Sequence, residues 1–87
     1  MPQLNPARRQ LNAEFDWIVG VNVSTFRLSR EMSQKDLANH ANMDQTVLNR
    51  VETGERSLKF REAICIAKAL KVRVEALTRR HDDIEYE

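Results

Sequence analysis

Between residues 33 and 54 the apolar positions recur at helical spacing in two stretches, a pattern that predicts two short helices joined by a turn. Ser33 and Asp36 stand at the spacing of a capping box, because the serine oxygen can accept from the amide three residues on while the carboxylate suits the positive helix end. The first helix should therefore begin at Gln34. Its inward face, spaced at i, i+1 and i+4, consists of Leu37, Ala38 and Ala41.

The turn and the second helix follow directly. Asn42 tolerates the left-handed backbone with which a chain leaves a helix, and Asp44 is the expected N-cap of the next helix. The apolar positions of that helix are Val47, Leu48 and Val51. Its opposite face then carries four polar residues of the types that read base edges, namely Gln45, Thr46, Asn49 and Arg50.

Residues 1–18 have a weaker helical pattern. Asn5 and Pro6 form a good N-cap and first-turn pair. An apolar stripe at helical spacing follows, made of Leu11, Phe15, Ile18 and Val19. We expect an extra N-terminal helix here that packs on the domain or on a partner. Trp17 is expected in the core, rather than in an exposed dimer contact.

Composition restricts the chain to a small helical domain. With 87 residues there is room for one domain, and no apolar run approaches the roughly 20 residues that cross a bilayer. No secretory signal opens the chain, so we expect a cytoplasmic protein without membrane contact. The single Cys65 cannot form an internal disulfide and is expected to be an inert core thiol.

Charge is unevenly distributed along the chain. The net charge is only +1, but an acidic tail at residues 79–87 contains Asp82, Asp83, Glu85 and Glu87. Because these four acids contribute −4, the rest of the chain carries +5. A basic body with an acidic tail suits a nucleic-acid binder that avoids non-specific contacts, although a frayed, solvated terminus explains the tail equally well.

Several motif pieces occur in register between residues 19 and 78. They are Gly20, Val23 and Arg27; Ser33, Gln34, Leu37 and Ala38; Val51, Glu52 and Gly54; and finally Ile66 to Leu70 with Val72 to Leu77. Together they resemble the helix-turn-helix family of lambdoid phage repressors and Cro proteins, also called the Xre family. The resemblance implies an all-α fold: a compact five-helix lambda-repressor-like domain, to which residues 1–18 would add the extra helix.

The resemblance also implies roles for individual residues. Arg27 and Glu52 match the family's structural ion pair, and Gln34 matches its phosphate-binding glutamine. The family usually has glycine where Lys71 stands, so a geometry other than left-handed is expected at that junction. The main base-reading positions of the family correspond to Gln45, Thr46 and Arg50.

The chemistry of these side chains is consistent with duplex recognition. Gln45 and Asn49 can pair bidentately with adenine, Arg50 can pair with guanine O6 and N7, and the Thr46 methyl can contact thymine. The alternative is a solvated helix face. His40 is expected to be an ordinary exposed histidine. Candidates for phosphate contact are Gln34, Asn39, Arg56, Ser57 and Lys59.

Enzymatic functions are disfavoured. His40 and His81 are far apart in the sequence, no glycine-rich phosphate loop occurs, and no carboxylate and histidine residues have metal-ligand spacing. We therefore expect no catalytic residue, no cofactor and no metal.

Two functions remain open within this fold. The first is a sequence-specific transcriptional regulator, most simply a repressor that binds double-stranded DNA as a homodimer at a pseudo-palindromic operator. The alternative is an antitoxin or other module that binds a protein partner through the N-terminal extension or the acidic tail and autoregulates through DNA.

Overall fold

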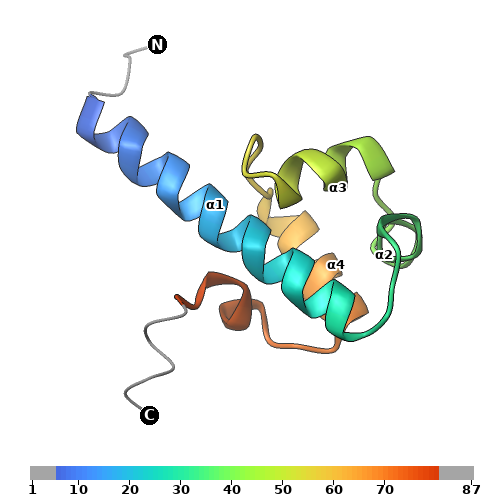
Figure 1. The fold of residues 1–87 in the computed structure, drawn as a ribbon. Helices are drawn as coiled ribbons and strands as arrows, with labels where there is room; N and C mark the ends of the chain where they lie inside the picture. Colours follow the sequence, from blue (N-terminus) through green and yellow to red (C-terminus); the bar gives the residue numbers. More distant parts are fainter. Residues whose placement is uncertain (1–5, 81–87) are drawn as a thin grey trace.

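The computed structural model describes residues 6–80, with side chains described from residue 12 onward. This part of the chain is all-α and contains no strand. It has four α-helices and one short 3-10 helix where the fifth helix was predicted (Figure 1). The elements are α1 (Pro6–Ser29), α2 (Gln34–His40), α3 (Gln45–Glu52), α4 (Phe60–Leu70) and η1 (Val74–Thr78).

The extra N-terminal helix is not a separate element. Helix α1 begins at Pro6 and continues without interruption across the boundary that the sequence placed at residues 18 and 19. The continuity has a simple cause, because no proline follows Pro6 in this segment and its one glycine, Gly20, lies inside the helix. In Figure 1 the blue, amino-terminal half of α1 extends beyond the other helices.

The expectation that Trp17 belongs to the core is wrong. Its side chain is 59% exposed, and Phe15 is 52% exposed, whereas Val19 and Val23 further along α1 are buried. Neighbouring segments do reach this part of α1, because Ser57 donates to Asp16 and the Trp17 backbone lies beside Gly54, but they cover the Phe15 and Trp17 side chains only in part. Two aromatic side chains are therefore left on the surface.

One apolar core holds the helices together. Helix α2 packs on α3 and α4, and α1 closes the other side through its contacts with α3 and η1. The inward positions predicted for α2 are all buried, whereas on α3 Val47 is only half-buried. Cys65 is half-buried at the edge of this core. The most completely buried side chains are Val23, Leu37, Leu48, Val51, Ile66, Leu70 and Leu77.

The predicted starts of α2 and α3 are confirmed. Ser33 Oγ accepts from the Asp36 amide at 3.0 Å, and the Asp36 carboxylate accepts from the Ser33 amide at 3.0 Å, which completes a capping box. These bonds to Ser33 hold the pKa of Asp36 below its usual value. Asp44 Oδ1 accepts from the amide of Thr46 at 2.8 Å.

All four α-helices end in the same way, with a left-handed residue followed by a chain that folds back. In α2, the amide of Met43 donates to the carbonyl of Ala38 across the left-handed Asn42 (φ 56°). Equivalent bonds close the other three helices, and the apolar residue after the left-handed position packs on the core in α1, α2 and α4. The left-handed residues are Glu31, Asn42, Gly54 and Lys71.

The expectation of another geometry at Lys71 is therefore wrong. Lys71 has φ 59° and ψ 42°, and the amide of Val72 donates to the carbonyl of Ala67 at 3.0 Å. A left-handed conformation costs a non-glycine residue about 1–2 kcal/mol. The hydrogen bond and the packing of Val72 on the core offset this cost, so the chain keeps the turn without a glycine.

Gly20 sits where α1 crosses the end of α3, which makes its small size a structural requirement. A Cβ atom at Gly20 would lie 2.4 Å from the carbonyl oxygen of Val51 and 2.9 Å from that of Glu52. Gly20→Ala should destabilise the fold by about 1–3 kcal/mol, because backbone atoms must move to make room. Ordinary helix propensity predicts the opposite sign, a gain of about 0.5–1 kcal/mol.

Thermal unfolding of Gly20→Ala checks this, with Thr25→Ala, an exposed position of the same helix, as control. The control should unfold near the wild-type temperature. An unchanged or raised midpoint for Gly20→Ala would show that α1 and α3 are not in close contact.

Candidate nucleic-acid interface

The outer face of α3 carries the four predicted base-reading residues. Leu48 and Val51 are buried on its inner side, so the helix can rotate little without exposing them. The side chains on the opposite side are all exposed to solvent. Gln45, Thr46 and Asn49 border a shallow hollow that Gln34 on α2 also lines. The exposed residues of α3 are Gln45, Thr46, Asn49 and Arg50.

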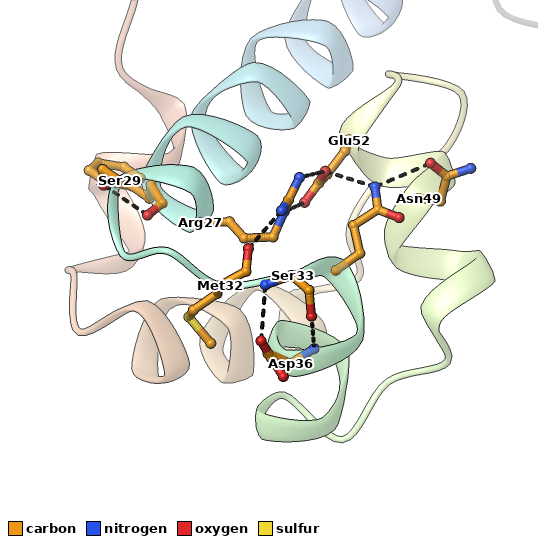
Figure 2. A network of polar contacts seen from close by, with 9 residues as sticks. Arg27, Ser29, Met32, Ser33, Asp36, Asn49 and Glu52 are labelled. Atoms are coloured by element: carbon orange, nitrogen blue, oxygen red, sulfur yellow. Dashed lines mark hydrogen bonds and ion pairs between the residues drawn. The ribbon is translucent and has the colours of Figure 1, made fainter.

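Arg27 and Glu52 fix α1 to the end of α3. Arg27 Nε donates to Glu52 Oε2 at 2.7 Å and Arg27 Nη2 donates to Glu52 Oε1 at 3.0 Å. The third bond of the guanidinium goes from Nη1 to the carbonyl of Met32 at 2.8 Å, in the loop before α2 (Figure 2). Only 11% of the Arg27 side chain and 5% of the Glu52 side chain are exposed. The pair therefore joins three parts of the domain in a largely dry environment.

Gln34 connects this ion pair to the outer face of α3. Its side-chain nitrogen Nε2 donates to Glu52 Oε1 at 3.0 Å and to Asn49 Oδ1 at 3.2 Å. Figure 2 shows the resulting chain of hydrogen bonds, which runs from Arg27 through Glu52 toward Asn49. A predicted phosphate-binding residue and a predicted base-reading residue thus contact each other.

Arg50 has only a loose partner within the protein. Its Nε lies 3.8 Å from Glu55 Oε2, and both side chains are more than half exposed. Solvent screens such a pair, so it holds the guanidinium only weakly. Arg50 is therefore available to an outside partner.

Arg56 makes a stronger internal pair. Its Nη1 and Nη2 atoms donate to the two carboxylate oxygens of Glu62 at 2.8 and 3.1 Å. Glu62 Oε1 also accepts from the amide of Lys59 at 2.9 Å, at the start of α4. The hydrogen bond with Arg56 lowers the pKa of Glu62 and raises the pKa of Arg56. Glu62 stands three residues after Lys59, a capping spacing from which its role was readable in the sequence.

Ser57 contacts an acid that the sequence did not single out. Its Oγ lies 2.7 Å from both carboxylate oxygens of Asp16 on α1, so it donates its hydrogen there. A contact across 41 positions leaves no local signal in the sequence. Because that hydrogen is engaged and the neighbour is an acid, Ser57 is the weakest of the predicted phosphate contacts.

The remaining candidates lie on the surface. Asn39, His40 and Lys59 are exposed. His40 Nδ1 donates to the carbonyl of Asp36 at 2.8 Å, an ordinary contact within α2. In the described part of the chain, no group of three or more His, Cys, Asp or Glu residues could hold a metal ion. No helix between residues 6 and 80 is long and apolar enough to span a bilayer.

A helix-turn-helix family model matches residues 23–77. The chain belongs to the helix-turn-helix family. This membership confirms the resemblance that the motif pieces between residues 19 and 78 indicated, and it supports the expectation of a DNA-binding regulator. No curated protein matches the chain significantly.

Several solved structures share the fold. The restriction-modification controller protein C.AhdI from Aeromonas hydrophila is 24% identical with a TM-score of 0.70, over 71% of this chain and 94% of that one. A hypothetical transcription factor from Neisseria, NHTF, is 21% identical with a TM-score of 0.80, over 86% and 84% of the two chains. A variant of the controller protein C.Esp1396I is 30% identical with a TM-score of 0.66, over 72% and 89%.

Removing the carboxylate of Glu52 should destabilise this helix-turn-helix domain strongly. Glu52→Ala leaves Arg27 largely buried without its charge partner, which costs about 3–5 kcal/mol when a buried pair is broken. Glu55→Ala is the matched control, because it removes an exposed acid that lies near Arg50, and exposed pairs contribute about 0–1 kcal/mol. Urea unfolding of the three proteins tests this. Similar midpoints for both variants would disprove a structural role for the ion pair.

The Arg56–Glu62 pair should make stability depend on pH in the acidic range. Because the folded pKa of Glu62 is lowered, its contribution is complete above the unfolded pKa of about 4.3 and is lost as pH falls through the folded pKa. Glu62→Gln keeps an oxygen for the Lys59 amide but lacks the charge. Its deficit in unfolding free energy should be largest near neutral pH and should shrink below about pH 4. A deficit that stays constant between pH 7 and pH 3 would contradict this.

Proposed function

We propose that this protein is a sequence-specific transcriptional regulator that binds double-stranded DNA with α3 in the major groove. The observation that carries the proposal is the exposed polar face of α3 on a helix-turn-helix scaffold. The residues proposed to meet base edges are Gln45, Thr46, Asn49 and Arg50. Their side chains combine amide, hydroxyl and guanidinium groups, which discriminate between base pairs in the major groove.

Contacts to the phosphate backbone would fix the protein on the duplex. Lys59 and Arg56 supply positive charge in the segment that follows α3, although Arg56 must share its guanidinium with Glu62. Asn39 on α2 is exposed, whereas the Ser57 hydroxyl is already bonded to Asp16. Gln34 completes the set of candidates, although its side-chain nitrogen already donates to Glu52.

The regulator would act as a homodimer in the cytoplasm, most simply as a repressor. Two recognition helices related by two-fold symmetry would read a pseudo-palindromic operator whose half-sites lie about 34 Å apart. The fold shared with restriction-modification controller proteins supports a regulatory role of this kind.

One observation favours the alternative of a protein-binding module. Phe15 and Trp17, in the middle of α1, are more than half exposed. Exposed aromatic side chains are frequent anchors of protein interfaces. The alternative would be an antitoxin, or a similar module, whose partner covers this part of α1 or binds the acidic tail, whose acidic residues lie outside the described residues.

Selection of bound sequences from a random duplex pool tests the proposed function. The wild-type protein should enrich a two-fold-symmetric site, and Arg50→Ala should lose about 1–3 kcal/mol of discrimination at one base pair of each half-site. Lys59→Ala is the control for a phosphate contact. It should weaken binding to all sequences alike and lower the salt dependence, without changing the selected site. Absence of any enriched sequence would favour the protein-binding module.

A further inference from the structure

The outward face of α1 carries an apolar stripe. Four large apolar side chains are strongly exposed in the described part of the chain, and two of them, Trp17 (59%) and Leu28 (61%), lie on this face. They are 11 positions apart, close to three full helical turns, so both side chains leave α1 on the same side. Val21 and Ser24, both half-buried, continue the stripe between them. Val23, on the opposite side of α1, is buried in the core, so the stripe faces away from the domain.

The stripe begins at a hollow. The hollow has a volume of about 470 Å³, and apolar side chains of α1 line it together with two arginines that follow η1; these residues are Trp17, Ile18, Val21, Arg79 and Arg80. Asn22 holds the second wall in place, because its Nδ2 donates to the carbonyl of Leu77 at 2.9 Å and to that of Arg79 at 2.7 Å. The hollow is therefore a fixed feature of the surface.

The stripe ends at a projecting side chain, that of Leu28. Phe26 and Leu28 are two positions apart, so they leave α1 on opposite sides. The guanidinium of Arg30 lies over the ring of Phe26, 5.2 Å from its centroid, and so does not cover Leu28. Glu31 follows directly and is exposed. One end of the stripe thus offers an aliphatic side chain beside an acid, and the other offers an apolar hollow beside two arginines.

We propose that a second copy of this chain packs antiparallel along α1, with Leu28 of each copy in the hollow of the other. In a two-fold interface, residue i contacts j and j contacts i. A two-fold axis between positions 22 and 23 sets Leu28 against the partner's Trp17 and Val21 against the partner's Ser24, whose small side chain allows close approach. A parallel pair would set Leu28 against its own copy and leave both hollows open. This inference rests on the homodimer of the proposed function and names its surface.

Charge favours a second copy as the occupant. Glu31 follows Leu28 directly, so in the antiparallel pair it comes near the partner's Arg79 and the partner's Arg80. Glu14 also lines the hollow, but the two arginines outnumber it and the rim has a net charge of +1. Opposite charges that meet across an interface fix its register and disfavour wrong arrangements. Parallel packing would bring the arginine pairs of both copies together.

Sedimentation equilibrium without DNA tests the interface. Leu28→Lys should raise the dissociation constant of the dimer at least about tenfold, because it removes buried apolar surface and sets a cation against the two arginines. A cation near the carboxyl end of α1 is compatible with the helix dipole, so the fold should persist. Phe60→Lys is the matched control: Phe60 is 78% exposed on α4, away from the stripe, and this variant should dimerise like the wild type. Thermal unfolding checks that both variants fold.

Charge reversal provides a second test. Glu31→Arg should weaken the dimer several-fold at low salt, and this loss should shrink at high salt. Adding Arg79→Glu and Arg80→Glu to the same chain should restore the dimer. A merely structural effect of Glu31→Arg would not be rescued in this way.

The outcomes separate this inference from the proposed function. A dimer that persists in Leu28→Lys, or that is lost in Phe60→Lys, would overturn the interface, and so would a wild-type protein that stays monomeric. If that protein still enriched a DNA site from the random pool, sequence recognition would stand without this interface. A dimer broken by Leu28→Lys and rescued by charge reversal would support the interface, even if no DNA sequence were enriched.

Discussion

The orientation of the exposed polar face of α3 depends on one largely buried ion pair, Arg27–Glu52. The Arg27 guanidinium donates two hydrogen bonds to Glu52 and one to the carbonyl of Met32. This single side chain therefore connects α1, α3 and the loop before α2. Close approach of α1 is allowed at Gly20, about two helical turns before Arg27, where no Cβ intervenes. The scaffold and the chemistry of the outer face therefore share one network, since Glu52 also receives the amide of Gln34.

Much of the central helix pair was predictable because its signals are local. The capping box at Ser33, the N-cap at Asp44 and the left-handed Asn42 depend on residues at most five positions apart. Apolar spacing then fixes which side of each helix is buried, and the polar side follows by exclusion. The exposed face of α3 was therefore readable before any packing was known.

Contacts between distant segments were not predictable in this way. The burial of Trp17 depends on whether neighbours cover its part of α1, and the helical spacing alone suggested a core position. The partners of Ser57 and Gln34 come from elements 41 and 15–18 positions away. These contacts decide which hydrogen-bonding groups are already engaged within the protein, so residue type indicated the candidate surface but not its donor and acceptor pattern.

The four left-handed helix ends have a consequence for how the sequence can change. Only Gly54 has the residue type that such a position favours, while Glu31, Asn42 and Lys71 retain a conformational penalty. For a small domain with a total stability of about 5–15 kcal/mol, each penalty is an appreciable fraction. Glu31 and Lys71 lie outside α3, so substitutions there can compensate for mutations on its exposed face. Such a chain can change residues on the exposed face of α3 while losses of stability are recovered at positions outside that face.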